Sequence, residues 1–233
     1  MGVLERRERE KQELREQILD AARTLFARDG YEAVTMRAIA EAIEYSPTAL
    51  YLYFKDKDDL LRELCVQDFR HLAHHFQTIA AIPDPVEKLR LTGRAYLEFG
   101  LAYPNHYRLM FMTRKPVQHD EGMESMKGNP EEDAYAFLRT IVLDCIAQGK
   151  FRKDLSDPDA VAQVLWVGVH GLVSLHIVMC EEHWVNWRPV RELGETLIDT
   201  QLNGMLRRPG AGLTVDPVTE NPAAGSGLPP TGN

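Results

Sequence analysis

Hydroxyl and amine side chains gather between residues 35 and 57, in the segment TMRAIAEAIEYSPTALYLYFKDK. Phosphate oxygens of nucleic acids accept hydrogen bonds from such groups, particularly at the starts of helices. We expect six of these side chains to lie at helix starts or on an outer face, where they can reach phosphates: Thr35, Ser46, Tyr51, Tyr53, Lys55 and Lys57. The chemistry that this segment offers is binding rather than bond-making.

A second candidate for chemistry is a histidine cluster made of His71, His74 and His75. His71 and His75 have the i, i+4 spacing that helical zinc sites use. A zinc site also needs a third protein ligand, and the sequence places none nearby. We favour a solvated or packing role for the cluster. The alternative function is an all-α metal-binding protein or enzyme built on these histidines.

Other catalytic patterns are absent from the sequence, which has no phosphate-binding loop, nucleophile elbow or paired carboxylates. Cys65, Cys145 and Cys180 lie far apart without CxxC spacing, which argues against a disulfide scaffold and fits a reducing cytoplasm. The N-terminus is too charged for a signal peptide. We therefore predict a cytoplasmic protein that is not an enzyme and uses no cofactor or metal.

Two short helices must hold the phosphate-binding candidates. Thr35 can cap the first helix, because its hydroxyl can accept from an unpaired N–H of the first turn. The apolar residues that follow have helical spacing and give this helix one apolar face: Met36, Ile39, Ala40 and Ile43. Glu44-Tyr45-Ser46 forms the turn after it.

The second helix is predicted from Pro47 to about Phe54. Ser46 is a good N-cap, and Pro47 occupies the first helical position, where a missing N–H costs nothing. Leu50 and Phe54 would face the first helix and leave Thr48 to face outward with the tyrosines. Helices this short bury little, so their value lies in presenting the second one to a groove, as in a helix-turn-helix.

Residues from about Leu14 to Leu64 resemble the DNA-binding end of the TetR/AcrR-type transcriptional regulators. The likeness rests on TMRAIAEAI, on SPTALYLYFKDK and on the Asp-Leu-Leu run that follows; up to Arg208 it concerns layout only. The resemblance implies an all-α chain with an N-terminal three-helix DNA-binding head and a larger helical domain that binds ligand and dimerises. It also implies a repressor released from its operator by a small molecule.

The resemblance adds residues to the predicted DNA contacts. Arg37, Pro47 and Thr48 become the candidates for touching base edges, and Tyr45 joins the DNA-binding set. The family usually has Gly-Val at the positions of Glu44 and Tyr45, and that glycine suits a positive φ. Glu44 must therefore accept some strain or take an ordinary turn geometry. Leu52-Tyr53 replaces the family's frequent Tyr-His.

Charge restricts how the chain could bind DNA. The net charge is −8, and residues 1–62 carry 11 Lys and Arg against 13 Asp and Glu, a net of −2. A DNA-binding surface must be a local patch, which excludes a nonspecific coat protein. In the predicted helix 5–29, basic and acidic residues alternate. We favour a solvated helix there over a basic arm entering the minor groove, because interleaved acids cancel the field.

Helix signals continue through the chain, and no stretch alternates with period two. Gly30 closes the first helix, and Asp56 caps a long linking helix to about Ala81. Further helix starts are predicted at three Asp/Asn-Pro pairs: Asp84-Pro85, Asn129-Pro130 and Asp157-Pro158. The longest internal loop is predicted at Thr113–Gly128. We expect a DNA-binding domain at 1–55, a ligand-binding and dimerisation domain at 56–208, and a disordered tail at 209–233.

Ala160–Cys180 is uncharged and long enough to cross a bilayer. A span would place Gln163, His170, Ser174 and His176 in lipid, and no basic flank would orient it. We favour a homodimer core formed with the Val190–Leu206 helix, where Gly168 and Gly171 permit close approach. A two-fold four-helix interface predicts a roughly palindromic operator in double-stranded DNA.

A ligand cavity is predicted where aromatic and Met residues are dense, from Tyr96 to Met112. The candidate lining is Tyr103, Tyr107, Phe111, Phe137, Ile141, Trp166 and His170. His170 is either a hydrogen-bonded core histidine or the polar group of that cavity. We expect an apolar or aromatic effector; a DNA-binding dimer that takes no ligand is the remaining alternative.

Overall fold

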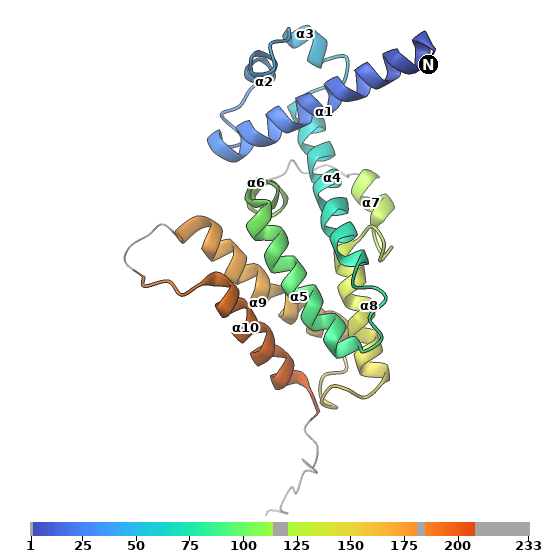
Figure 1. Cartoon of the computed structure of the whole chain (residues 1–233), viewed down its shortest axis with the longest axis vertical. Helices are drawn as coiled ribbons and strands as arrows, with labels where there is room; N and C mark the ends of the chain where they lie inside the picture. The colour runs from blue at the N-terminus through green and yellow to red at the C-terminus, as the bar shows by residue number, and fades with distance from the viewer. Residues whose placement is uncertain (1, 114–120, 181–184, 208–233) are drawn as a thin grey trace, which may run out of the picture.

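The computed structural model of the chain describes residues 2–113, 121–180 and 185–207. A small helical head stands at one end of a larger helical body, and one long helix runs from the head into the body (Figure 1). Within the described ranges the only strand-like pairing is an isolated antiparallel bridge between Phe151 and Leu206. The predicted all-α class is confirmed.

The head contains α1 (Val3–Asp29), α2 (Met36–Ala42) and α3 (Pro47–Leu50). Gly30 ends α1, as predicted: its φ is 82°, and its N–H donates to the Phe26 carbonyl at 3.0 Å. The core of the head contains apolar residues from its own three helices, from the first turns of α4 and from Leu109, so it extends beyond residue 55. Its members include Ile18, Leu19, Phe26, Ile39, Leu50, Phe54, Leu60, Leu61, Leu64, Cys65 and Leu109.

The linking helix is α4 (Lys57–Gln77), capped by Asp56, whose carboxylate accepts from the Asp59 N–H at 2.7 Å. The predicted end at Ala81 is wrong by one turn. After Gln77 the chain continues in i→i+3 hydrogen bonds, such as the Ile79 N–H to the Phe76 carbonyl at 2.9 Å. A single continuous helix, α4, therefore connects the head to the body.

The body consists mainly of α5 (Pro85–Ala102), α8 (Ala134–Ala147), α9 (Pro158–Met179) and α10 (Val190–Met205), which pack against one another. Aspartates cap the first three, and the predicted starts at Asp84-Pro85 and Asp157-Pro158 are confirmed. Three ion pairs join α5 to α10 and hold their register: Arg90–Asp199, Arg94–Glu195 and Glu98–Arg191.

Two predictions for the middle of the chain are wrong. Asn129 starts a turn instead of a helix, because its carbonyl accepts the N–H of Glu132 at 3.0 Å and of Asp133 at 2.7 Å. Asp133 caps α8 in its place. The expected loop Thr113–Gly128 contains α7 (Glu121–Met126), while residues 114–120 and the predicted tail lie outside the described residues.

Two short elements follow α5 that sequence reasoning did not separate: α6 (Pro104–Tyr107) and the π-helical turn η1 (Arg108–Met112). They contact both α1 and α4. In η1, Leu109 enters the head core while Phe111 packs on the body core. This turn therefore touches both parts of the molecule.

One described helix, α9, is long and apolar enough to cross a membrane by length and composition. Core helices of soluble proteins pass the same test, so a single such helix is weak evidence for a span. Here α9 packs against α5, α8 and α10, with Val161, Ala162, Val169 and Val173 buried.

Candidate nucleic-acid interface and apolar cavity

The helix-turn-helix is held by its predicted caps. Thr35 Oγ1 accepts from the Ala38 N–H at 3.1 Å, and Ser46 Oγ accepts from the Ala49 N–H at 3.3 Å. The expected extension of the second helix to Phe54 is wrong, because α3 ends at Leu50. The chain then turns with i→i+3 bonds, including the Tyr53 N–H to the Leu50 carbonyl at 2.9 Å.

Of the two alternatives for Glu44, a strained backbone or an ordinary turn geometry, the structure has the strained one. Its φ is 59°, in the left-handed region that favours glycine. The cost for a residue with a Cβ is about 1–2 kcal/mol. This geometry lets the Tyr45 N–H donate to the Ala40 carbonyl at 2.9 Å and closes α2 tightly against α3.

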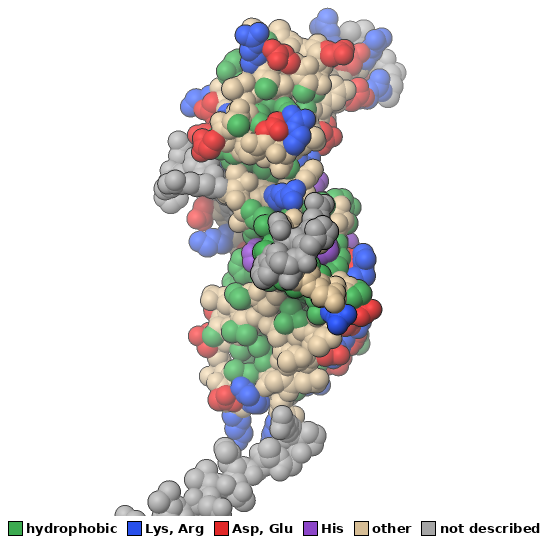
Figure 2. Space-filling model, turned by 90° about the vertical axis from the view of Figure 1, so that its left-hand side faces the viewer, with side chains coloured by type: hydrophobic (Ala, Val, Ile, Leu, Met, Phe, Trp, Pro, Cys, Tyr) green, Lys and Arg blue, Asp and Glu red, His purple; other side chains and the backbone are tan. Residues whose placement is uncertain are grey.

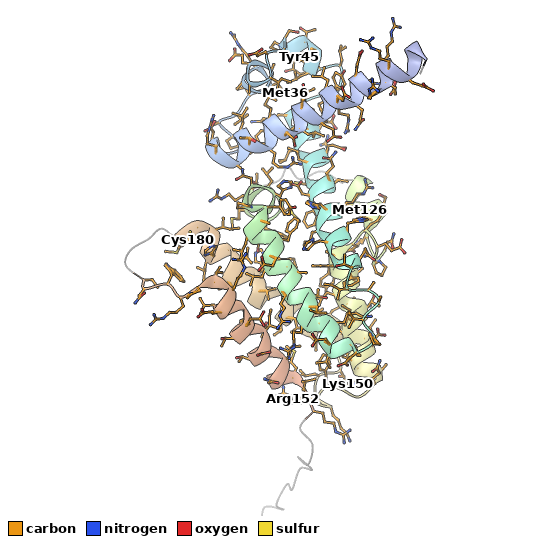
Figure 3. All side chains as sticks on the ribbon, viewed as in Figure 1. Met36, Tyr45, Met126, Lys150, Arg152 and Cys180 are labelled. Atoms are coloured by element: carbon orange, nitrogen blue, oxygen red, sulfur yellow. The ribbon has the colours of Figure 1, made fainter. Side chains whose placement is uncertain are left out.

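Most of the predicted DNA contacts lie on the surface of the head. The exposed ones are Thr35, Arg37, Tyr45, Ser46, Thr48, Tyr51 and Lys55, while Pro47 and Tyr53 are half-buried. Figure 3 shows Tyr45 at the outer end of the head, above Met36. The hydroxyl hydrogens of Thr35 and Ser46 are not used by their caps, which need only the oxygen as acceptor. Sequence reasoning left out Leu52, which is 81% exposed beside Tyr51.

Lys57 is the exception among the predicted contacts. Its Nζ donates to the backbone carbonyls of Tyr31 at 2.7 Å and Val34 at 2.9 Å, and reaches that of Glu32 at 3.4 Å. It also lies 4.2 Å from the centroid of the Tyr31 ring. The ammonium group thus clamps the α1–α2 connection inside the protein. Its partners are more than 20 positions away in sequence, so no local pattern predicted them.

A buried charged cluster joins the head to the body. The Asp68 side chain on α4 is 1% exposed and accepts from Arg23 Nη2 of α1 at 3.1 Å. His106 Nδ1 of α6 lies 2.8 Å from the same oxygen. Among the described residues, the other Asp68 oxygen and Arg23 Nε have no partner. Three elements therefore meet at one carboxylate.

The body contains a cavity of about 500 Å³. Its lining comes from α4, α5, η1, the α7–α8 segment, α9 and α10, and is mostly hydrocarbon and aromatic: Phe69, Leu72, Phe76, Leu89, Thr92, Gly93, Tyr96, Phe111, Glu124, Met126, Lys127, Glu132, Asp133, Ala134, Tyr135, Leu138, Leu165, Trp166, Val169, Ile198, Gln201 and Leu202. Size and lining are those of a small-molecule site.

The cavity only partly coincides with the predicted lining. Phe111 and Trp166 line it. Phe137 and Ile141 are buried in the body core, and exposed Tyr103 makes an edge-on contact with the His71 ring, with centroids 4.7 Å apart. The missed residues include an apolar series on α4 at helical spacing, which is the signal that could have found them: Phe69, Leu72 and Phe76.

The other two predicted residues, Tyr107 and His170, form a polar network next to the cavity. The Tyr107 hydroxyl lies 2.6 Å from His170 Nδ1, and the Tyr96 hydroxyl lies 2.9 Å from it. Trp166 Nε1 donates to the Tyr96 oxygen at 3.1 Å. Burial raises the pKa of both tyrosines and lowers the pKa of His170, so all three are neutral near pH 7. This side of the cavity carries no charge.

The histidines on α4 show packing and solvated roles. His71 contacts the rings of Phe99, Tyr103 and His106, and its burial lowers its pKa. His74 and His75 are exposed. In the described part of the chain, no three His, Cys, Asp or Glu side chains are grouped to hold a metal ion.

One face of α9 carries exposed apolar side chains at helical spacing: Val164, Val167, Leu175 and Val178. Gly171 lies between them, and a Cβ built there would meet no atom within 4 Å. At Gly168, by contrast, a Cβ would collide with Gln201 of α10. Figure 2, which looks at the side formed by α9 and α10 in Figure 1, shows apolar side chains gathered on the lower body.

Two family models match the chain. The model for bacterial regulatory proteins of the tetR family matches residues 18–64. The model for the tetracyclin repressor-like C-terminal domain matches residues 89–180. The first covers the helix-turn-helix and the second covers most of the helices around the cavity.

Similar proteins are transcriptional regulators by name. The HTH-type transcriptional repressor Rv1474c of Mycobacterium tuberculosis is 42% identical over 59 residues, which are 25% of this chain and 32% of that protein. The chain thus aligns with about a third of this relative. The probable acrEF/envCD operon repressor of Escherichia coli K12 is 25% identical over 169 residues, covering 69% and 74% of the two chains. The TetR family regulator PfmR from Thermus thermophilus shares the fold, with a TM-score of 0.65, 22% identity and coverage of 83% and 98%.

Proposed function

The chain belongs to the TetR family of bacterial regulatory proteins, and on that premise we propose that it is a cytoplasmic, homodimeric repressor. In this proposal it binds a palindromic operator and releases it when a small apolar molecule enters the body. One observation carries the proposal: α4 begins at the helix-turn-helix and also forms a wall of the cavity. A ligand in that cavity would therefore contact α4, the helix that connects the body to the head.

The DNA-reading surface is proposed to be the exposed side of α2, α3 and the turn after them. Arg37 and Thr48 are the candidates for base edges, and both are exposed. Tyr51, at the end of α3, and Lys55, in the connection between α3 and α4, would contact phosphates. Lys57 is removed from this set, because its ammonium group is bound to backbone carbonyls within the head.

Selection of bound fragments from random DNA, followed by footprinting, tests the DNA-binding function. We expect a roughly two-fold symmetric site. Lys55→Ala should weaken binding to all sequences alike and reduce the slope of log affinity against log salt by about one. The matched control is Lys153→Ala, an exposed lysine next in the chain to Arg152, which Figure 3 shows at the end of the body away from the head. An unchanged slope for Lys55→Ala, or failure to select any DNA, would contradict the proposed docking or the function respectively.

The dimer interface is proposed on the apolar face of α9, together with α10. Three exposed valines and one exposed leucine on one helical face need a partner surface in a soluble protein. Gly171→Leu tests this directly, since a Cβ at this position has no described atom of its own chain within 4 Å and the added side chain would protrude into the proposed partner. We expect weaker dimerisation and weaker operator binding, measured by sedimentation and by DNA titration. A wild-type chain that sediments as a monomer at micromolar concentration contradicts the interface.

The effector site is proposed to be the 500 Å³ cavity. The effector can shift the head only by its difference in affinity for the DNA-bound and free states, typically about 1–3 kcal/mol. Apolar compounds that raise the melting temperature should also release operator DNA, and Trp166→Ala should reduce both effects. Compounds that stabilise the wild-type protein and the Trp166→Ala variant equally would place the effector site elsewhere. A regulator that no compound releases would instead be controlled by its abundance.

A further inference from the structure

The inner wall of the cavity offers hydrocarbon to an entering molecule. Its few polar donors are already used within the protein. The Thr92 hydroxyl and the Gln201 amide nitrogen each donate to a backbone carbonyl at 2.8 Å. Trp166 Nε1 donates to the Tyr96 hydroxyl, which also lies in the network with His170. Apart from the second N–H of Gln201, a polar group inserted there would lose its water without gaining a donor, so the ligand part that fills this region is mostly apolar.

Charged lining residues occur at one end of the cavity, in the α7–α8 segment: Glu124, Lys127, Glu132 and Asp133. Glu124 pairs with Lys127 at 3.7 Å, and both are exposed. Asp133 is fully engaged, since its oxygens accept three backbone N–H groups at 2.9–3.1 Å. Half-buried Glu132 has no side-chain partner among the described residues. Of the charges that the structure describes here, its carboxylate is the one left uncompensated.

The segment that carries Glu132 is fixed to the body. Met126 is buried at the end of α7, where Figure 3 shows it beside α4. Gln77 Nε2 of α4 donates to the Pro130 carbonyl at 2.9 Å. Asp133, the next residue after Glu132, caps α8. The carboxylate therefore stands at a defined position on the cavity edge.

Aromatic rings continue inward from this end. Tyr135 lies three residues after Glu132, and its ring centroid is 6.2 Å from that of Trp166. The Trp166 centroid is in turn 6.1 Å from that of Phe111. All three rings line the cavity. Ring faces attract organic cations, and a nearby carboxylate adds to that attraction.

We propose that the cavity selects a cationic amphiphile, an apolar body carrying an alkylammonium-type group that sits between Glu132 and the Tyr135–Trp166 rings. This inference rests on the proposed function, because it names the chemical class of its effector. An alkyl carboxylate of the same length would place its charge beside the Glu132 carboxylate. Among the described residues that line the cavity, the one ammonium group is on Lys127, whose side chain is 74% exposed and already paired with Glu124.

Calorimetric titration of the full-length protein with octyltrimethylammonium, octanol and octanoate tests the proposal. The three probes share one apolar body, and all are used below their micelle-forming concentrations. We expect the cation to bind about tenfold more tightly than the alcohol, and the carboxylate to bind least. Equal binding of all three, or preference for octanoate, would overturn the proposal.

Two neighbouring variants separate charge recognition from folding. Glu132→Gln keeps the shape of the side chain and removes its charge, so cation affinity should fall about tenfold while octanol affinity stays within about twofold. Glu131→Gln is the matched control, because Glu131 is exposed and does not line the cavity. A Glu132→Gln protein that retains its cation preference would overturn the proposal.

Release of a selected operator distinguishes this inference from the proposed function. Release by octyltrimethylammonium supports both. Release by octanoate but not by the cation overturns the ligand class and leaves the regulator intact. A chain that selects no operator at all refutes the proposed function, whatever the cavity binds.

Discussion

The head and the body are built from the same apolar residue types, but their interiors are closed differently. In the head, residues such as Ile18, Leu19, Ile39 and Leu50 are completely buried, and the core is completed by Leu109 from η1. In the body, helices of similar composition surround a cavity of about 500 Å³. A dense core resists deformation, whereas an unfilled one leaves side chains without packing partners.

This difference matches two physical requirements. A surface that contacts DNA must hold its groups at fixed positions, and a close-packed core does this. A site for a small molecule must leave volume that the ligand fills, and the unliganded protein forgoes those contacts. The following predictions test whether close packing and buried hydrogen bonds stabilise the head, and whether the unfilled volume lowers the stability of the body.

The largest expected effect comes from opening a hole in the head core. Leu109→Ala should lower the free energy of unfolding by about 3 kcal/mol, because Leu109 is fully buried among residues from α1 and α4. Urea unfolding at fixed protein concentration measures the change. Met112→Ala, on the same turn and 38% exposed, is the control and should cost less than about 1 kcal/mol. Similar costs for both variants would show that Leu109 does not complete the core.

A somewhat smaller effect on stability is expected from replacing Lys57, with its neighbour Lys55 as the comparison. Lys57→Met should destabilise the head by about 2 kcal/mol, because it leaves the carbonyls of Tyr31 and Val34 without their charged donor. Lys55→Met should change stability by less than about 0.5 kcal/mol, since its side chain is exposed. The same unfolding assay, paired with operator titration, should assign Lys57 to folding and Lys55 to DNA. Equal stabilities of the two variants would contradict this assignment.

Filling the cavity should stabilise the body. Ala134→Leu adds apolar volume at the cavity edge and should raise the free energy of unfolding by about 1 kcal/mol while weakening ligand binding. Ala147→Leu, exposed at the other end of α8, should do neither. Destabilisation by Ala134→Leu with ligand binding intact would mean that the space is not available to a side chain.

The smallest effect concerns the α5–α10 ion pairs and pH. The hydrogen bond and charge of Arg94 lower the pKa of Glu195. A carboxyl group with a lowered folded pKa contributes stability above its unfolded pKa, and this is lost as the pH falls through the folded pKa. Arg94→Gln should therefore cost roughly 0.5 kcal/mol at pH 7, because both side chains are largely solvated. Thermal melts should show that the stability difference between the wild type and Arg94→Gln shrinks below pH 4.5. A stability difference that persists in acid would show that the Arg94–Glu195 pair is not its cause.

Local features of the fold could be read from the sequence because each depends on residues within about one helical turn. Thr35, Ser46 and Asp56 cap the helices they were expected to cap, and Gly30 ends α1. The long uncharged helix expected at Ala160–Cys180 is found as α9 (Pro158–Met179). Where the prediction failed, at Asn129 and after Leu50, alternative turns competed for the same carbonyl groups over equally short distances.

The parts of the site that the sequence could not determine depend on contacts between distant residues. Whether a buried aromatic side chain lines a cavity or fills a core depends on the rotation of several helices about their axes. That rotation separated Trp166 from Phe137 and Ile141. Lys57 likewise binds carbonyl groups more than 20 residues earlier in the chain.

By itself the sequence determined an all-helical chain, its helix-turn-helix and the starts of the helices that follow Thr35, Ser46, Asp56, Asp84 and Asp157, because capping and periodicity are local properties. Only the tertiary structure decided that Leu109 completes the head core, that the Lys57 ammonium group binds the Tyr31 and Val34 carbonyls, and that Glu132 lines the same cavity as the Trp166 and Phe111 rings. Each of these depends on the packing of elements far apart in the chain, and packing is a property of the whole assembled core.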